Sequence, residues 1–359
     1  MSTTAEAIAA FGLRSRHTLD EAELSGDEAI ALLHECERDR LLGLLAHAVR
    51  DGVLAFDEDA RDRLEQLYRA WLGHDVRVER LLIRARARLW RASIPSRVLK
   101  GVALAHTAYA DPALRVFGDV DLLVPGAQLL AAIDELEREF RTTRVQPELR
   151  PGFDQRFGKE VMLRCDGLEL DVHRVFVEGA LGLTIDTADL FAPPYRFAFG
   201  GAELEALPMP QRLLHACYAA ALGDWPPRLV SLRDVAQLVI REQPNLLDVL
   251  MMADRWQCEA VVARAVNTAW ERLRLVDRPP LVEWAARYQP GPRQRLLLAA
   301  HEGSGRAFTR HLASLVVLPG WGQRVAYARA IAFPQPEYLE ARGMTTRSHA
   351  SRAFHRIFG

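Results

Sequence analysis

Residues 115–124 read Arg115-Val116-Phe117-Gly118-Asp119-Val120-Asp121-Leu122-Leu123-Val124, and they carry the most informative pattern in the chain. In an extended strand, alternate side chains point to opposite faces, so Asp119 and Asp121 share one face while the apolar residues share the other. Two carboxylates this close on a half-buried strand repel each other and resist desolvation unless a positive charge lies between them. A divalent cation is the usual solution, and Mg²⁺ favours one or two carboxylates together with substrate phosphates.

A second strand with the same alternation is predicted at Leu168-Glu169-Leu170-Asp171-Val172-His173. Its polar residues share one face. If this strand lies beside the first, Asp171 adds a third carboxylate to the pair. His173 then orients Asp171, contacts a substrate or reaches a phosphate, or it is only a partly buried histidine at the end of a strand. Alternatively, Asp119 and Asp121 merely line a solvent face, and Asp171 is unrelated to them.

Asp166-Gly167 separates two extended runs, residues 156–164 and 168–175, and this dipeptide is a good signal for a two-residue hairpin. The expected register pairs Cys165 with Leu168, Met162 with Asp171 and Glu160 with His173. Glu160 would join the polar face and Lys159 would point to the other side. A slip of one residue would exchange these two.

Upstream, Arg97-Val98-Leu99 is a short β-like run, and Lys100-Gly101 opens a helical stretch through Tyr109. The start of a helix has free N–H groups that suit a phosphate, and Lys100 and Arg115 flank this position. Lysine occurs only at Lys100 and Lys159. A general bias toward arginine explains this without consequence; alternatively, Lys100 is retained because the site needs a compact ammonium group.

The remaining chain is mostly helical by periodicity. Helices are expected over residues 58–71 and 76–90, and an amphipathic helix over 128–140. We therefore predict an α+β protein with an N-terminal helical region (1–94), a core with a small mixed sheet and helices (95–204) and a C-terminal helical region (205–333). A loosely held tail (334–359) completes the expected layout. His215 is expected to be a core histidine in an apolar helix, with contact to a ligand or substrate as the alternative. Arg233 and Asp234 are expected at the surface, with a local pair or a reach into the core as the alternatives.

Composition excludes several classes of protein. The 359 residues are 49% hydrophobic and 26% charged, with a net charge of -1, which is typical of a soluble globular chain and argues against general DNA binding. No apolar run approaches the roughly 18 residues of a membrane helix, and no signal peptide is evident. Four widely spaced cysteines, Cys36, Cys165, Cys217 and Cys258, indicate buried, reduced thiols. We expect a cytoplasmic protein with no membrane contact.

The segments 98–101, 115–124 and 170–173 together resemble the uncharacterised nucleotidyltransferase family of bacteria, a branch of the polymerase-β-like superfamily. The resemblance extends to the helical flanks and implies a polymerase-β-like core. It also implies that Asp119, Asp121 and Asp171 bind metal and carry catalysis. The superfamily's usual Gly-Ser phosphate turn is replaced here by Lys100-Gly101. The positions expected to hold the nucleotide are Lys100, Gly101, Arg115, Gly118 and His173.

The implied activity is transfer of a nucleoside monophosphate from an NTP to an acceptor, with one or two Mg²⁺ ions and release of pyrophosphate. The acceptor is left open among small molecules, peptides, proteins and RNA. Phosphoryl transfer from the same site is an alternative. So is a non-catalytic nucleotide- or partner-binding protein, whose signature would be a broken carboxylate set. All three carboxylates are present here.

Overall fold

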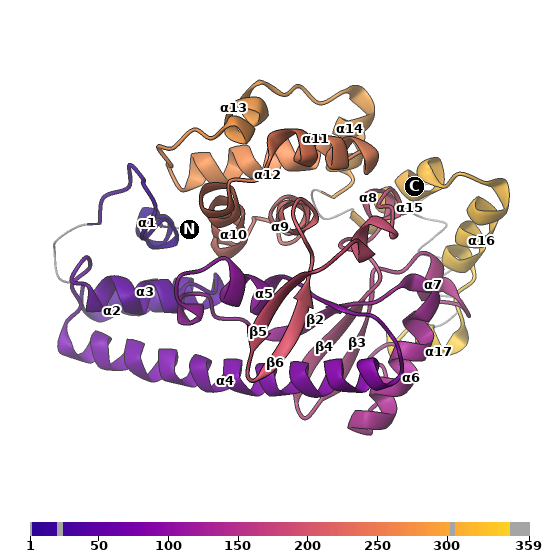
Figure 1. Ribbon diagram of the computed structural model, residues 1–359, viewed down its shortest axis with the longest axis horizontal. Coiled ribbons are helices and arrows are strands. Elements are labelled where there is room, and N and C mark those ends of the chain that lie inside the picture. The colour runs from indigo at the N-terminus through magenta and orange to yellow at the C-terminus, as the bar shows by residue number, and fades with distance from the viewer. Residues whose placement is uncertain (1, 20–23, 302–305, 345–359) are drawn as a thin grey trace.

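One mixed sheet of six strands organises the computed structural model, which describes residues 2–19, 24–301 and 306–344 (Figure 1). The strand order is β3-β4-β2-β1-β6-β5. Pairs β2–β4 and β1–β6 are parallel, and the other neighbours are antiparallel. The predicted α+β class is confirmed, but the β5–β6 hairpin was not predicted. The strands are β1 Arg97–Val98, β2 Asp119–Leu123, β3 Glu160–Cys165, β4 Leu168–His173, β5 Tyr195–Phe199 and β6 Ala202–Ala206.

The β3–β4 hairpin has the predicted register. Met162 pairs with Asp171 and Glu160 with His173. Asp166 and Gly167 both have positive φ angles, 52° and 79°, as the tightest hairpin turns require. The Asp-Gly turn therefore fixes which residues of β3 share a face with Asp171.

Four helices precede the sheet: α1 Thr3–Ala9, α2 Gly26–Arg38, α3 Leu42–Arg50 and α4 Glu58–Arg91. The prediction of two helices over 58–90 was wrong, because α4 is continuous for 34 residues. Gly73 interrupts the helical pattern, but a single glycine costs a helix only about 1 kcal/mol relative to alanine. Packing on both sides of Gly73 outweighs that cost, since Tyr68 and Val78 are both buried.

One face of the sheet packs on α4 and α6 (Leu129–Phe140), where Val120 and Leu122 belong to the same apolar cluster as Leu82 and Leu136. Figure 1 shows α4 running along this side of the sheet. Because Val120 and Leu122 point to this face, Asp119 and Asp121 point to the other. Other helices of this part are α5 Lys100–Thr107, α7 Phe153–Arg156 and α8 Ala180–Leu183.

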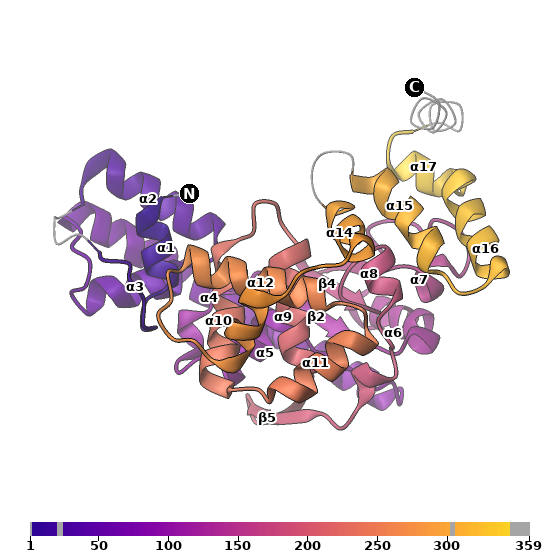
Figure 2. The same ribbon diagram turned by 90° about the horizontal axis from the view of Figure 1, so that it is seen from above.

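Helices α9–α14 lie on the opposite side of the sheet from α4 (Figure 1). Figure 2 shows α1–α3 at one end of the molecule and α15–α17 at the other. Leu123 packs into the apolar cluster of these helices, so the carboxylate face of β2 is turned toward them. The helices are α9 Gln211–Leu222, α10 Leu229–Gln237, α11 Leu246–Arg255, α12 Glu259–Arg272, α13 Pro280–Arg287, α14 Pro292–Ala299, α15 Arg306–Val317, α16 Trp321–Ala332 and α17 Pro336–Ala341.

Part of the predicted tail is ordered. Within it, α17 buries Leu339, and the Gln335 N–H donates a hydrogen bond to the Leu149 carbonyl. Residues 345–359 lie outside the described part of the chain. All four cysteines are free thiols and buried, as predicted. Among the described residues, no helix combines the length and apolarity needed to cross a membrane.

Candidate active site

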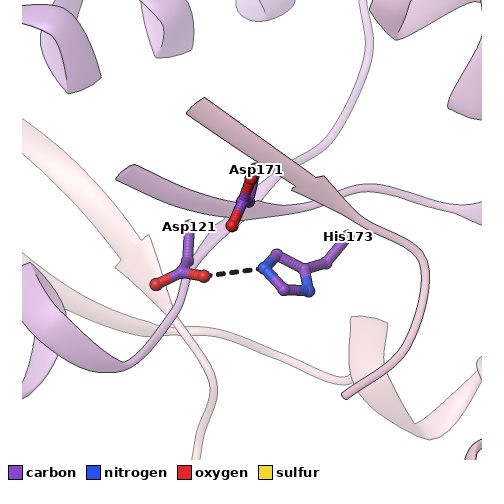
Figure 3. Close-up of side chains that lie close together, drawn as sticks. All are labelled: Asp121, Asp171 and His173. Carbon is purple, nitrogen blue, oxygen red and sulfur yellow. Dashed lines mark hydrogen bonds and ion pairs between the residues drawn. The ribbon is translucent and has the colours of Figure 1, made fainter. Parts of the chain in front are cut away.

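Two carboxylates face each other across the centre of the sheet. Asp121 on β2 and Asp171 on β4 are direct partners in the parallel register, as the sequence predicted if the strands were neighbours. Both are buried, and His173 lies one side-chain period beyond Asp171 on the same strand. Figure 3 shows the three side chains converging, with the His173 ring against Asp121. Ligand atoms of all three lie within 4.8 Å of one another.

Asp121 is held as a charged group. Lys100 Nζ lies 3.2 Å from Asp121 Oδ1, and His173 Nε2 donates to the same oxygen at 2.7 Å. Burial opposes ionisation of Asp121, but Lys100 and His173 outweigh it and hold the pKa of this carboxyl well below its usual range. The Asp121 carboxylate therefore carries its charge without exposure to water.

Asp171 is in the opposite situation. Its buried Oδ1 has no hydrogen-bond partner. Burial, followed by the negative charges of Glu160 and Asp121, raises the pKa of Asp171 to about 7. An unpartnered carboxylate oxygen in a group of two aspartates and a histidine fits a divalent cation, because a cation would satisfy that oxygen and relieve the repulsion. The residues present thus fit the metal that the sequence implied.

Asp119 lies apart from this group. It shares a face with Asp121 but is partly exposed, and its strand partner is Glu169. Its Oδ1 accepts a hydrogen bond from Arg40 Nη1 at 3.2 Å. The group that could hold a metal ion in this geometry is thus Asp121, Asp171 and His173, whereas the sequence had suggested Asp119 in place of His173.

Helix α4 holds the turn that leads into β2. His74 Nε2 donates to the Gly118 carbonyl at 3.0 Å, and Asp75 Oδ1 accepts from the Phe117 N–H at 3.1 Å. Burial raises the pKa of Asp75 to about 7, although the Phe117 hydrogen bond opposes the shift. Gly118 has little space, since a Cβ there would lie 3.0 Å from Arg40 Nη2. The position of Asp119 therefore depends on α4 as well as on its own strand.

Lys100 and Gly101 form the first turn of α5, beside Asp121. Gly101 packs so closely on Phe117 that a Cβ would lie 3.1 Å from the Phe117 Cβ. The Lys100 side chain is 31% exposed, and its ammonium group contacts Asp121. The expected arrangement of a helix start and a lysine beside the carboxylates is present.

Arg115 has a different environment from the one expected. Its Nε and Nη2 each donate to Asp234 at 2.9 Å, and both side chains are buried. Tyr109 Oη also donates to Asp234, at 2.8 Å. The guanidinium is thus bound to a carboxylate of α10 instead of facing the β2 carboxylates. A charge taken fully out of water needs such a partner.

The predicted surface location of Arg233 and Asp234 was wrong, because both are buried. Arg233 donates to the carbonyls of Ala9 and Phe11. A signal was available in the sequence: Asp234 lies four residues from Val230 and from Leu238, which puts it on the apolar face of its helix.

His215 is a buried core histidine, as expected. Its ring packs on Phe176 with centroids 4.4 Å apart, and it lines a cavity of about 10 Å³ that also contacts Lys100. Burial holds the pKa of His215 well below its ordinary value, so the imidazole is neutral.

Glu160 shares the polar face as predicted, with Oε2 3.3 Å from His173 Nδ1. Lys159 was expected to point away, but its Nζ lies 2.7 Å from Glu160 Oε2. The alternation rule does not apply to Lys159, because it sits in a bend before β3 begins. Although burial opposes ionisation, His173 and Lys159 lower the pKa of Glu160.

A family comparison bears directly on this site. Residues 25–274, more than two thirds of the chain, match the family described as uncharacterised nucleotidyltransferase. The chain belongs to this family. Family membership confirms the enzyme class predicted from the sequence, a nucleotidyltransferase.

A solved structure is similar to about half of this nucleotidyltransferase chain. The solution structure of the antibiotic-resistance factor ANT(2'')-Ia is similar, with 13% sequence identity and a TM-score of 0.36. The match covers 52% of this chain and 94% of that one. No curated protein matches the chain.

Proposed function

We propose that this protein transfers a nucleoside monophosphate from an NTP to an acceptor in a Mg²⁺-dependent reaction that releases pyrophosphate. The observation that carries the proposal is the direct pairing of Asp121 with Asp171 on adjacent parallel strands, both buried, with one carboxylate oxygen unpartnered. Two buried facing carboxylates are costly, and a bound cation offsets that cost. Family membership supports the same reaction class.

Asp121 and Asp171 would hold the metal, with His173 as a third ligand or as the group that orients Asp121. We keep Asp119 as a candidate ligand because it lies on the same face of β2. The metal, when bound, would supply positive charge to the phosphate oxygens. Lys100 and the first turn of α5 would face the pyrophosphate end of the nucleotide.

The chemistry is a displacement at the α-phosphate. A lone pair of the acceptor oxygen or nitrogen forms a bond to the α-phosphorus, and the bond from that phosphorus to the bridging oxygen of the β-phosphate breaks. Pyrophosphate leaves with the electron pair. The proton of the acceptor passes to a base, and Asp171 is the candidate, through the carboxylate oxygen that would not be bound to the metal.

Pyrophosphate release tests the proposal. Each of the four NTPs is incubated with Mg²⁺ and a cell extract or candidate acceptor, using the wild type and Asp121→Asn. We expect release by the wild type with at least one NTP and a loss of at least about 100-fold in the variant, since a residue proposed to hold the metal at the reacting phosphates is removed. Asp166→Asn is the matched control, because Asp166 is an exposed aspartate at the turn of the β3–β4 hairpin and lies outside the group of Asp121, Asp171 and His173.

The products separate the alternatives. Release of a nucleoside diphosphate without pyrophosphate would replace nucleotidyl with phosphoryl transfer. Nucleotide binding without turnover, in the presence of an extract containing candidate acceptors, would favour a non-catalytic binding protein. Equal release by the wild type and Asp121→Asn would contradict the proposed site.

A further inference from the structure

Arg40 occupies a backbone position that normally favours glycine. It follows α2, where the Leu41 N–H donates to the Cys36 carbonyl and the Arg40 N–H to the Glu37 carbonyl. This pair of bonds ends a helix with one residue in the left-handed region, and Arg40 has φ 56°. A non-glycine residue is strained there.

The surrounding contacts hold the Arg40 backbone in place. The neighbouring Asp39 is buried, and its Oδ1 accepts from the Leu229 N–H at the start of α10. On the other side, Gly43 packs so tightly on η1 (Pro112–Leu114) that a Cβ would lie 2.2 Å from the Ala113 carbonyl oxygen. The loop between α2 and α3 therefore contacts both α10 and η1, which hold it in place.

From this position the Arg40 side chain reaches the candidate active site. Its Nη1 donates to Asp119 Oδ1 at 3.2 Å, and its Nη2 lies over Gly118. The side chain is 22% exposed. Among the described residues, this is the one hydrogen bond recorded for the Arg40 guanidinium, which has five N–H groups in all. The remaining N–H groups are available to a ligand.

We propose that Arg40 binds the phosphates of the nucleotide. This inference rests on the proposed function and adds a residue to it. Arg115, which the sequence predicted to bind the nucleotide, instead forms a buried ion pair with Asp234. Arg40 and Lys100 instead contact the two carboxylates of β2, one cation on each. A planar guanidinium matches phosphate oxygens in pairs.

Binding of inorganic tripolyphosphate with Mg²⁺ tests the contact without involving the base or the acceptor. Calorimetry compares the wild type, Arg40→Gln and Arg40→Gly. Arg50→Gln is the control, because this substitution also removes an ion pair from the N-terminal helical region, the one between Arg50 and Glu65. We expect both Arg40 variants to bind about tenfold more weakly, as for one lost charge-assisted hydrogen bond, and the control to bind like the wild type.

Thermal unfolding separates a ligand contact from a structural role. Glycine relieves the left-handed strain, so Arg40→Gly is expected to unfold at a higher temperature than Arg40→Gln while both lose affinity equally. An Arg40→Gln change made in an Asp119→Asn background distinguishes a direct contact from an effect through Asp119. A direct contact predicts the same loss in this background; no further loss there would overturn the proposal.

The inference and the proposed function can fail separately. If the wild type binds tripolyphosphate and releases pyrophosphate, but the Arg40 variants bind as tightly as the wild type, Arg40 is not a phosphate ligand and the function stands. If the wild type neither binds tripolyphosphate nor releases pyrophosphate from any NTP, both proposals are wrong.

Discussion

Asp121 and Asp171 lie opposite each other on adjacent parallel strands, yet the protein stabilises the charge of Asp121 and destabilises that of Asp171. Asp121 is neutralised by Lys100 and His173, whereas Asp171 has an unpartnered oxygen and a pKa raised to about 7 by burial and by Glu160 and Asp121. Replacing one or the other should therefore have opposite effects on stability. This difference gives the first test of the site.

Asp171→Asn should stabilise the metal-free protein at pH 8 by about 2 kcal/mol. Because the pKa of Asp171 is higher in the folded state than in the unfolded state, the protonated carboxyl contributes stability that is fully present below pH 4. This stability is lost as the pH rises through about 7, so at pH 8 the charge of Asp171 is unfavourable in the folded protein. Asp121→Asn should instead destabilise by about 2 kcal/mol, because it leaves Lys100 without its partner. Urea unfolding with EDTA measures both. Equal effects of the two substitutions would contradict this electrostatic account.

Asp75 should make stability depend on pH. Its pKa is about 7 in the folded protein and near 3.8 when unfolded, so the folded state binds the proton more tightly between these values. The resulting stability is present at pH 4 and lost as the pH rises through 7. The substitution Asp75→Asn keeps an oxygen acceptor for the Phe117 N–H without the charge.

The measurement for Asp75 is the difference in unfolding free energy between Asp75→Asn and the wild type. We expect this difference to shift in favour of the variant by about 2 kcal/mol between pH 5 and pH 8. Comparing the two proteins at each pH cancels the contribution of other titrating groups. A constant difference across the range would show that Asp75 has an ordinary pKa.

The buried Arg115–Asp234 pair should be structural. Asp234→Ala removes the partner of a buried guanidinium and of the Tyr109 hydroxyl, so we expect a loss of about 3–5 kcal/mol in the free energy of unfolding. Asp224→Ala breaks an exposed pair with Arg228 and should cost less than about 1 kcal/mol. Chemical denaturation measures both, and similar costs for the two variants would refute the buried role.

Two glycine-to-alanine substitutions should change the free energy of unfolding in opposite directions. Gly73→Ala in the continuous helix α4 meets no atom within 4 Å, so it should stabilise by about 0.5–1 kcal/mol through helix propensity. Gly43→Ala places a methyl group against the Ala113 carbonyl and should destabilise by at least about 1–3 kcal/mol. Thermal unfolding of the two variants checks this, and stabilisation by Gly43→Ala would show that α3 does not approach η1 closely.

Local periodicity determined much of the central site. Alternation along a strand put Asp119 and Asp121 on one face, and the Asp-Gly turn fixed the pairing of Met162 with Asp171. Both signals act over a few residues, through backbone geometry alone. They were therefore readable in the chain, and so was the resemblance that family membership confirmed.

Tertiary packing decided which charges meet. Arg115 lies six residues from Asp121 in the chain but is paired with Asp234, while Arg40, 79 residues before Asp119, contacts that carboxylate. Sequence distance carries no information about such pairs, because they depend on how α2, α10 and the sheet pack together. The same packing brought His173 into the group with Asp121 and Asp171 and left Asp119 beside Arg40. The sequence by itself thus determined which carboxylates face the site, and the fold determined which cations meet them, since burial forces each charge to find a partner in space.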